Sequence, residues 1–265
     1  MKYTWNLVKV AATQAVVLTM VVGCGTASNS SSLKITKGSP VRATASGPER
    51  ISTVGLLGAL SEDQGFSCTA EVLADDLLVT AGHCVDANAQ IFAFFGTDMN
   101  TDQDRDEYVE VTSAIVNPGF TGADDSSGEL PEHDIAVLKL NGTVPSRFQP
   151  VALASSSLDL AADDTVRVAG FGENENGKSG ILRYVDSTYA GQDDQGRLVI
   201  ADKARRGACS GDSGGPLFAQ EDGKWYLAGV LSGGPVPCRG IDIYTSVAAH
   251  RSFLSQSVKR LESAD

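Results

Sequence analysis

Three segments carry residue types that together can cut an acyl bond. The segment Gly207–Pro216 reads Gly-Ala-Cys-Ser-Gly-Asp-Ser-Gly-Gly-Pro and places Ser213 among glycines. His83 follows an apolar run, and Asp134 precedes another. A serine hydroxyl is a weak nucleophile until a base takes its proton, and a carboxylate can orient a histidine base. A serine, a histidine and an aspartate in these settings indicate nucleophilic catalysis.

The glycines around Ser213 allow a tight backbone turn. Such a turn lets the amides of Gly211 and Ser213 point together at a developing oxyanion. Gly211–Gly215 also fits the G-x-S-x-G turn of α/β-hydrolases such as esterases. That fold requires an acid and then a histidine after the serine, but only His250 follows here. The esterase alternative is therefore rejected, and His133 and His250 are interpreted as structural or surface residues.

The elements that must position these residues are short strands. The chain has 265 residues, 28 of them glycine, with a net charge of −12 that argues against binding nucleic acid. Apolar runs of strand length, bounded by turn residues, predict an all-β sandwich or a pair of barrels. These runs are 54–60, 77–80, 91–95, 108–116, 135–140, 165–169, 181–185, 225–231 and 241–245. A helix is expected after Ser246, because Val247, Leu254, Val258 and Leu261 share one face.

The N-terminus has the pattern of an export signal. Residues 1–23 combine Lys2 and Lys9 with a long apolar run and predict a signal peptide. Val21-Val22-Gly23-Cys24 resembles a bacterial lipobox, so Cys24 is the expected lipidation site. The alternative is an ordinary cleaved signal that contains a cysteine. The serine-rich stretch that follows is expected to be a flexible tether.

Five cysteines are present, and lipidation of Cys24 would leave an even four: Cys68, Cys84, Cys209 and Cys238. Two disulfides in an oxidising compartment are favoured over free thiols or a zinc site, because no CxxC spacing is present. Three pairings are possible from the sequence alone.

Together, the three segments resemble those of the trypsin/chymotrypsin family of serine proteases, over roughly 35–261. The resemblance implies an all-β fold: two six-stranded antiparallel barrels, with the active site between them and a C-terminal helix. It assigns His83 as general base, Asp134 as orienting carboxylate and Ser213 as nucleophile. The expected boundaries are a tether or short propeptide at 24–34 and a protease domain at 35–265. Within that domain, barrels are expected at about 35–145 and 146–245, and the helix at about 246–262.

The same resemblance implies a Cys68–Cys84 bridge and a Cys209–Cys238 bridge. Lys34-Ile35 resembles the junction at which zymogens of the family are cut. The new ammonium of Ile35 would then pair with Asp212, beside the nucleophile. With lipid on Cys24, cleavage after Lys34 would release the protease from its membrane.

The resemblance also implies which residues set the substrate specificity. Gly207 falls at the base of the specificity pocket, where trypsins carry Asp, and Asp242 falls on its side wall. Ser232, Gly233 and Gly234 match the strand that pairs with an extended substrate, although the family's usual Trp is here Gly233. Mixed or weakly basic specificity is the resulting hypothesis.

The expected partners are polypeptide substrates and, through Cys24, a membrane of the bacterial cell envelope before activation. A monomer is expected, and no cofactor or metal. Structural calcium in the acidic loop Asp98–Glu107 is the exception considered, although a solvated acidic loop is preferred. A protease-like binding module without activity and a lipid-anchored structural protein are the competing functions, and the complete Ser/His/Asp set argues against both.

Overall fold

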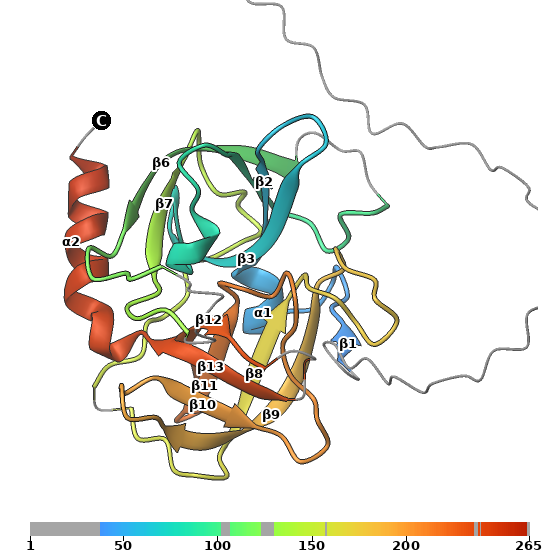
Figure 1. The fold of residues 1–265 in the computed structure, drawn as a ribbon, viewed down its shortest axis with the longest axis vertical. Coiled ribbons are helices and arrows are strands. Elements are labelled where there is room, and N and C mark those ends of the chain that lie inside the picture. The colour runs from blue at the N-terminus through green and yellow to red at the C-terminus, as the bar shows by residue number, and fades with distance from the viewer. Residues whose placement is uncertain are drawn as a thin grey trace, which may run out of the picture. The chain divides into compact units, whose positions relative to one another are not determined.

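The computed structural model describes residues 38–101, 107–122, 130–156, 158–235, 238 and 240–263, which lie in one compact unit spanning 32–265. Within these ranges the chain forms two antiparallel β-barrels and a C-terminal helix (Figure 1). The predicted fold class is therefore confirmed. No helix among the described residues has the length and apolar character needed to cross a bilayer.

The first barrel closes in the strand order β2-β3-β4-β7-β6-β5. Its strands are β2 (Thr53–Ala59), β3 (Gly65–Ala74), β4 (Leu77–Thr80), β5 (Gln90–Phe94), β6 (Tyr108–Val116) and β7 (Ala136–Leu140). Alternate side chains such as Val54, Leu56, Ala70 and Val72 fill its interior. The short helix α1 (Pro48–Ile51) precedes β2, and the 3-10 turn η1 (Gly82–Cys84) follows β4.

The second barrel is closed by β8 pairing with both β9 and β11. Its strands are β8 (Thr165–Gly170), β9 (Arg183–Gln192), β10 (Leu198–Ala201), β11 (Pro216–Glu221), β12 (Lys224–Gly233) and β13 (Ile241–Ser246). The two-residue strand β1 (Ser39–Pro40) pairs with β9, so the first described residues of the chain lie on this barrel.

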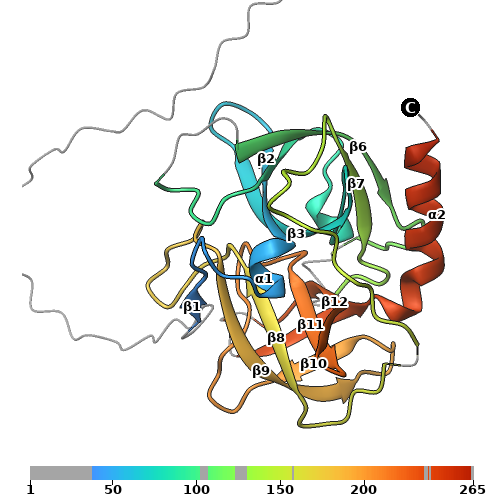
Figure 2. The same cartoon turned by 180° about the vertical axis from the view of Figure 1, so that it is seen from behind.

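The helix α2 (Arg251–Glu262), preceded by the 3-10 turn η3 (Ala248–His250), lies beside β7 of the first barrel (Figure 2). Leu254 and Leu261 on its buried face join the core of that barrel. The C-terminal segment thus begins on the second barrel and ends on the first.

Strands β1, β10 and β11 are absent from the runs that the sequence predicts, and so is the longer strand β3. Thr69 and Glu71 interrupt its apolar pattern, yet both are fully buried. They alternate with Cys68, Ala70 and Val72 of the barrel interior and therefore point out of the barrel. The Thr69 hydroxyl contacts Gly211 of the second half, so this polar face is covered rather than solvated.

Candidate active site

Pairing of β4 with β7 brings His83 and Asp134 together. Thr80, the last residue of β4, is the register partner of Ala136, the first residue of β7. Asp134 lies two residues before that pair, and His83 lies three residues after it in the turn η1. Two antiparallel strand ends at one edge of the barrel therefore present the two side chains to each other.

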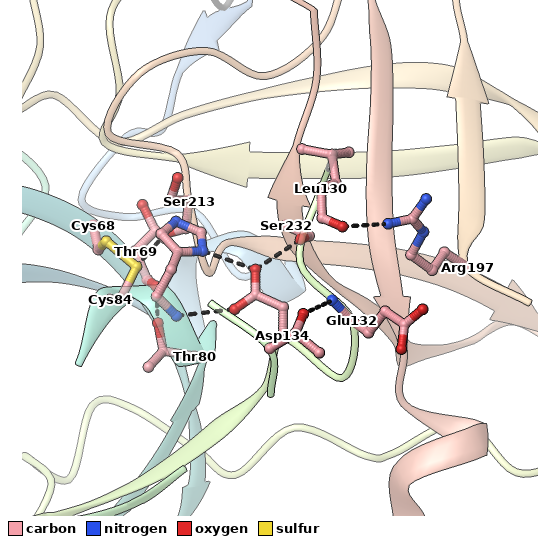
Figure 3. A network of polar contacts seen from close by, with 12 residues as sticks. Cys68, Thr69, Thr80, Cys84, Leu130, Glu132, Asp134, Arg197, Ser213 and Ser232 are labelled. Carbon is pink, nitrogen blue, oxygen red and sulfur yellow. Dashed lines mark hydrogen bonds and ion pairs between the residues drawn. A yellow bond between two sulfur atoms is a disulfide. The ribbon is translucent and has the colours of Figure 1, made fainter. Parts of the chain in front are cut away.

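Asp134 is fully buried and accepts three hydrogen bonds (Figure 3). Its Oδ1 accepts the backbone N–H of His83 at 2.9 Å, and its Oδ2 lies 2.8 Å from His83 Nδ1. The Ser232 hydroxyl donates to the same Oδ2 at 2.7 Å. A carboxylate oxygen accepts these hydrogen bonds, so a neutral His83 carries its proton on Nδ1 and has a lone pair on Nε2.

Ser213 lies in the turn before β11, on the second barrel, and its backbone carbonyl contacts residues of the first barrel. The Thr69 N–H donates to Ser213 O at 2.8 Å, and Cys84 Sγ lies 3.6 Å from the same oxygen. Cys84 directly follows His83 in the chain. The following residue, Gly214, has φ +79°, and a Cβ there would overlap the Thr80 hydroxyl. A glycine is therefore needed for the nucleophile turn to approach the first barrel.

The peptide preceding Gly211 is oriented by a hydrogen bond. Glu173 N–H donates to Ser210 O at 2.9 Å, so the Gly211 N–H on the opposite side of that peptide plane points away from Glu173. Gly211 has φ +92°. The amides of Asp212 and Gly214 are used within the fold, donating to Cys209 O and Leu231 O. Within the described part of the chain, no acceptor is recorded for the Gly211 and Ser213 amides.

Thr69 was not predicted from the sequence, although it supports this turn. Its hydroxyl donates to Gly211 O at 3.1 Å and accepts the Phe171 N–H at 3.2 Å. The Ser232 side chain was missed as well, since only its backbone was expected to matter. No spacing in a single sequence shows that either hydroxyl reaches a residue from another strand.

Asp212 is a fully buried carboxylate held by two backbone amides. Its oxygens accept Gly172 N–H at 2.7 Å and Cys209 N–H at 2.8 Å. Burial raises the pKa of Asp212 to about 8, against the lowering effect of these two hydrogen bonds. The predicted partner, Ile35, lies outside the described residues, as do Lys34 and Cys24.

A cavity of about 160 Å³ opens beside Ser213. Its lining includes Ala208, Cys209, Ser210, Leu231, Gly233, Gly234, Pro235, Cys238 and Asp242. Asp242 Oδ2 accepts the Ala208 N–H at 2.9 Å, and a Cβ on Gly207 would overlap this carboxylate. Burial raises the pKa of Asp242 to about 7, aided by the nearby charge of Asp202.

The residue at position 233 is a glycine, and its neighbour occupies the space above it. A Cβ on Gly233 would lie 2.8 Å from Leu130 Cδ2. The Leu130 carbonyl is held by Arg197 Nη1 at 3.2 Å. Leu130 therefore lies where a side chain at position 233 would begin.

The disulfides are Cys68–Cys84 and Cys209–Cys238, with Cα–Cα distances of 6.2 and 5.5 Å. The first ties β3 to the turn that carries His83. The second ties the segment before Ser213 to the far side of the cavity. Both pairings are those that the family resemblance implies.

Donor atoms with metal-ligand spacing are found at one place in the described ranges. Only Cys68, His83 and Cys84 form a group of three close donor atoms, and both sulfurs belong to a disulfide rather than to thiolates. In the acidic loop considered for calcium, 102–106 lie outside the described residues. Its flanking carboxylates are engaged, Asp98 by the Asn100 N–H and Glu107 by Arg147.

Comparisons with known proteins agree with this geometry. The family model "Trypsin" matches residues 50–254. Trypsin-1 of Astacus astacus is 29% identical over 216 residues, covering 72% of this chain and 88% of the relative. CLIP domain-containing serine protease B4 of Anopheles gambiae is 27% identical, covering 73% of this chain and 62% of the relative.

Vitamin K-dependent protein C of Oryctolagus cuniculus is 24% identical, and the match covers 77% of this chain but 49% of that longer protein. Among solved structures, human heparin binding protein aligns with a TM-score of 0.65 at 22% identity, covering 84% of this chain and 96% of its own. A second structure, titled "Structure of GrC", aligns with a TM-score of 0.69 at 18% identity. The alignment covers 84% of this chain and 99% of that structure's chain. The match to the family model spans well over half of the sequence, and the chain belongs to the trypsin family of serine proteases.

Proposed function

We propose that this protein is a serine endopeptidase in which Ser213, His83 and Asp134 form the catalytic triad. The observation that carries the proposal is the buried Asp134, which receives both His83 hydrogen bonds and leaves Nε2 as the free base. The segment that holds Ser213 packs against the turn that holds His83, through Thr69 and Cys84.

In this mechanism His83 Nε2 takes the proton of the Ser213 hydroxyl as its oxygen attacks the substrate carbonyl. The imidazolium that forms is stabilised by Asp134 and then gives its proton to the leaving amine. Water enters, His83 deprotonates it, and hydrolysis of the acyl-enzyme restores Ser213. The Ser232 hydroxyl holds Asp134 and thereby supports the orientation of His83.

The amides of Gly211 and Ser213 are the proposed oxyanion hole. Removing one donor of this kind typically costs about 3 kcal/mol of transition-state stabilisation. The Glu173 contact to Ser210 O and the Thr69 contact to Gly211 O fix the peptide planes on either side of Gly211. Fixed amides need no reorganisation when the negative charge develops.

For specificity we propose that the cavity beside Ser213 receives the residue before the scissile bond. Asp242 supplies a carboxylate for a Lys or Arg side chain, and the apolar lining from Ala208, Leu231 and Pro235 admits apolar residues. Ser232, Gly233 and Gly234 would present their backbone to the extended substrate.

Activation is proposed to follow cleavage after Lys34. Gly38 is held by Arg183 Nη1 at 3.2 Å, and Ser39 pairs with Tyr184 in β9. From Gly38, three residues reach back to Ile35, a span of up to about 10 Å. The buried Asp212 carboxylate, bounded by Gly170 and Gly172, is the acceptor that an inserted ammonium would neutralise.

Export and anchoring are proposed from the N-terminal pattern and from the two disulfides, which are typical of oxidising compartments. Lipid on Cys24 would hold the zymogen on the bacterial envelope. The four cysteines among the described residues are paired with one another, within the protease domain. Fractionation tests this: cleaved protein starting at Ile35 should leave the membrane fraction. Cleaved protein that stays lipid-anchored would contradict it.

The endopeptidase is tested by cleavage of a mixed peptide library by the trypsin-treated protein. Internal cleavage is expected for the wild type and is expected to be lost in Ser213→Ala and His83→Ala. Folded wild type that binds peptides without cutting them would favour the alternative, a protease-like binding module.

A further inference from the structure

Two histidines that lie 117 residues apart in the sequence are in contact, and one of them, His133, directly precedes Asp134. His133 Nδ1 lies 3.0 Å from His250 Nε2, and the rings pack edge to face with centroids 5.3 Å apart. His133 comes from the loop before β7, and His250 closes η3 at the start of α2. The contact therefore joins the loop of Asp134 to the C-terminal helix.

The hydrogen-bond pattern fixes both tautomers. His250 Nδ1 lies 2.7 Å from Ser246 O, an acceptor, so this nitrogen carries the proton. The Nε2 of a neutral His250 is then an acceptor, and His133 must donate to it from its own Nδ1. His133 and His250 are thus both held as Nδ1–H tautomers.

The backbone of His133 needs such a restraint. Its φ is +50°, in the left-handed region that costs a non-glycine residue about 1 kcal/mol or more. Its ring packs closely on Gly119, where a Cβ would lie 2.8 Å from His133 Cδ2. The His133 carbonyl accepts the Ile135 N–H at 2.8 Å, so the turn of His133 encloses Asp134.

We propose that His250 is a positioning residue that holds Asp134 toward His83 through its hydrogen bond to His133, and that a doubly protonated pair releases this hold. The proposal rests on the proposed protease function. A first proton can enter at His133 Nε2 and leaves the Nδ1–H···Nε2 bond intact. A second must enter at His250 Nε2, the acceptor itself, and breaks the bond.

The charged groups around His133 and His250 leave the second protonation, at His250 Nε2, possible. The two rings line a hollow of about 570 Å³ with Glu132 from the same loop and Arg197 from the β9–β10 connection. Arg197 is paired with Asp193 at 2.7 Å. The part of α2 that lines the hollow contributes Ser252 and Phe253, and Arg251 instead donates to Leu153 O and Ala154 O. Burial lowers the pKa of His250, as does the nearby His133, while the hydrogen bond to Ser246 O raises it.

Amide side chains give matched tests of the bond. Glutamine can place an acceptor where His250 Nε2 lies, whereas asparagine at 250 can reach only Ser246 O. We expect His250→Asn to lower kcat about 3- to 10-fold with KM unchanged, the range of one net hydrogen bond, and His250→Gln to restore it. Ser252→Ala, in the first turn of α2, is the control and should match the wild type. Equal kcat in the asparagine and glutamine variants would overturn the proposal.

His250→Gln keeps an acceptor for the His133 Nδ1–H and cannot be protonated, so it removes the release step. On the acid side, wild-type kcat/KM is expected to fall more steeply than the tenfold per pH unit that a single general base gives. His250→Gln should return the slope to tenfold. Identical slopes in the two proteins would contradict the release step.

Nitrogen-15 NMR reads the pair without any assay of activity, because the chain has only three histidines. At pH 8 both pair residues should show protonated Nδ1 and unprotonated Nε2, and their titrations should be coupled. Independent titration, or an Nε2–H tautomer at His250, would overturn the inference even if the enzyme is active. Inactive wild type with the coupled titration would instead reject the protease function.

Discussion

The Asp242 carboxylate occupies the space that a side chain at Gly207 would need. The two positions are therefore coupled: an acid at position 242, which lines the cavity, leaves room only for a glycine at position 207. Asp242 Oδ2 accepts the Ala208 N–H, and this hydrogen bond fixes the position of the carboxylate.

This coupling predicts a double-mutant result. Asp242→Ala should lower kcat/KM for Lys and Arg substrates about tenfold or more relative to apolar ones, because it removes the buried charge. Gly207→Asp alone should lower the cleavage of both basic and apolar substrates, because the new side chain would overlap the Asp242 carboxylate and repel its charge. Gly207→Asp with Asp242→Gly should recover basic cleavage. An unchanged basic-to-apolar ratio in Asp242→Ala would exclude its role.

The same carboxylate predicts a pH-dependent specificity. Its pKa is raised to about 7, so Asp242 in the free enzyme is neutral at pH 6 and charged at pH 8. The basic-to-apolar ratio of kcat/KM should therefore rise across this range, and taking the ratio cancels the titration of His83. Asp242→Asn should give a flat ratio. A ratio that rises equally in both proteins would assign the effect elsewhere.

Asp212→Asn tests the activation model. In the cleaved protein this change would leave a buried ammonium without a partner, a loss of about 3–5 kcal/mol. We expect peptide cleavage to fall at least about 100-fold while the protein stays folded, and the uncleaved form to be little affected. Equal activity in the cleaved wild type and variant, measured with one peptide, would reject the Ile35–Asp212 pair.

Glu71 predicts an effect on stability rather than on catalysis. It is fully buried, neither carboxylate oxygen has a partner among the described residues, and burial raises its pKa well above the ordinary value. A folded pKa above the unfolded one means that stability falls as pH rises above the unfolded pKa, near 4.5. Glu71→Gln should therefore raise Tm more at pH 8 than at pH 5, by about 2–4 °C for each kcal/mol. An equal Tm change at both pH values would contradict this.

Much of the site is predictable from the sequence because its residues lie in short local patterns. The turn around Ser213 requires glycines, and His83 and Asp134 flank apolar strands that pair. Strand β3 was missed because its outward face carries Thr69 and Glu71, buried against other parts of the fold rather than in the apolar barrel interior.

The supporting contacts could not be predicted, because they join distant segments. His133 and His250 were interpreted as structural or surface residues, and nothing in one sequence shows that they share a hydrogen bond. The Ser232 hydroxyl reaches Asp134 from 98 residues away. The coupling of Gly207 to Asp242 likewise joins two residues that are 35 positions apart in the sequence.

The most direct test of the central claim is labelling by a fluorophosphonate probe, located by mass spectrometry, before and after limited trypsin treatment. We expect the label to appear on Ser213 only after cleavage at Lys34, and Ser213→Ala to stay unlabelled. Labelling without cleavage would keep the nucleophile and discard the activation step. Folded, cleaved protein that takes no label at Ser213 would contradict the assignment of this chain as a serine endopeptidase.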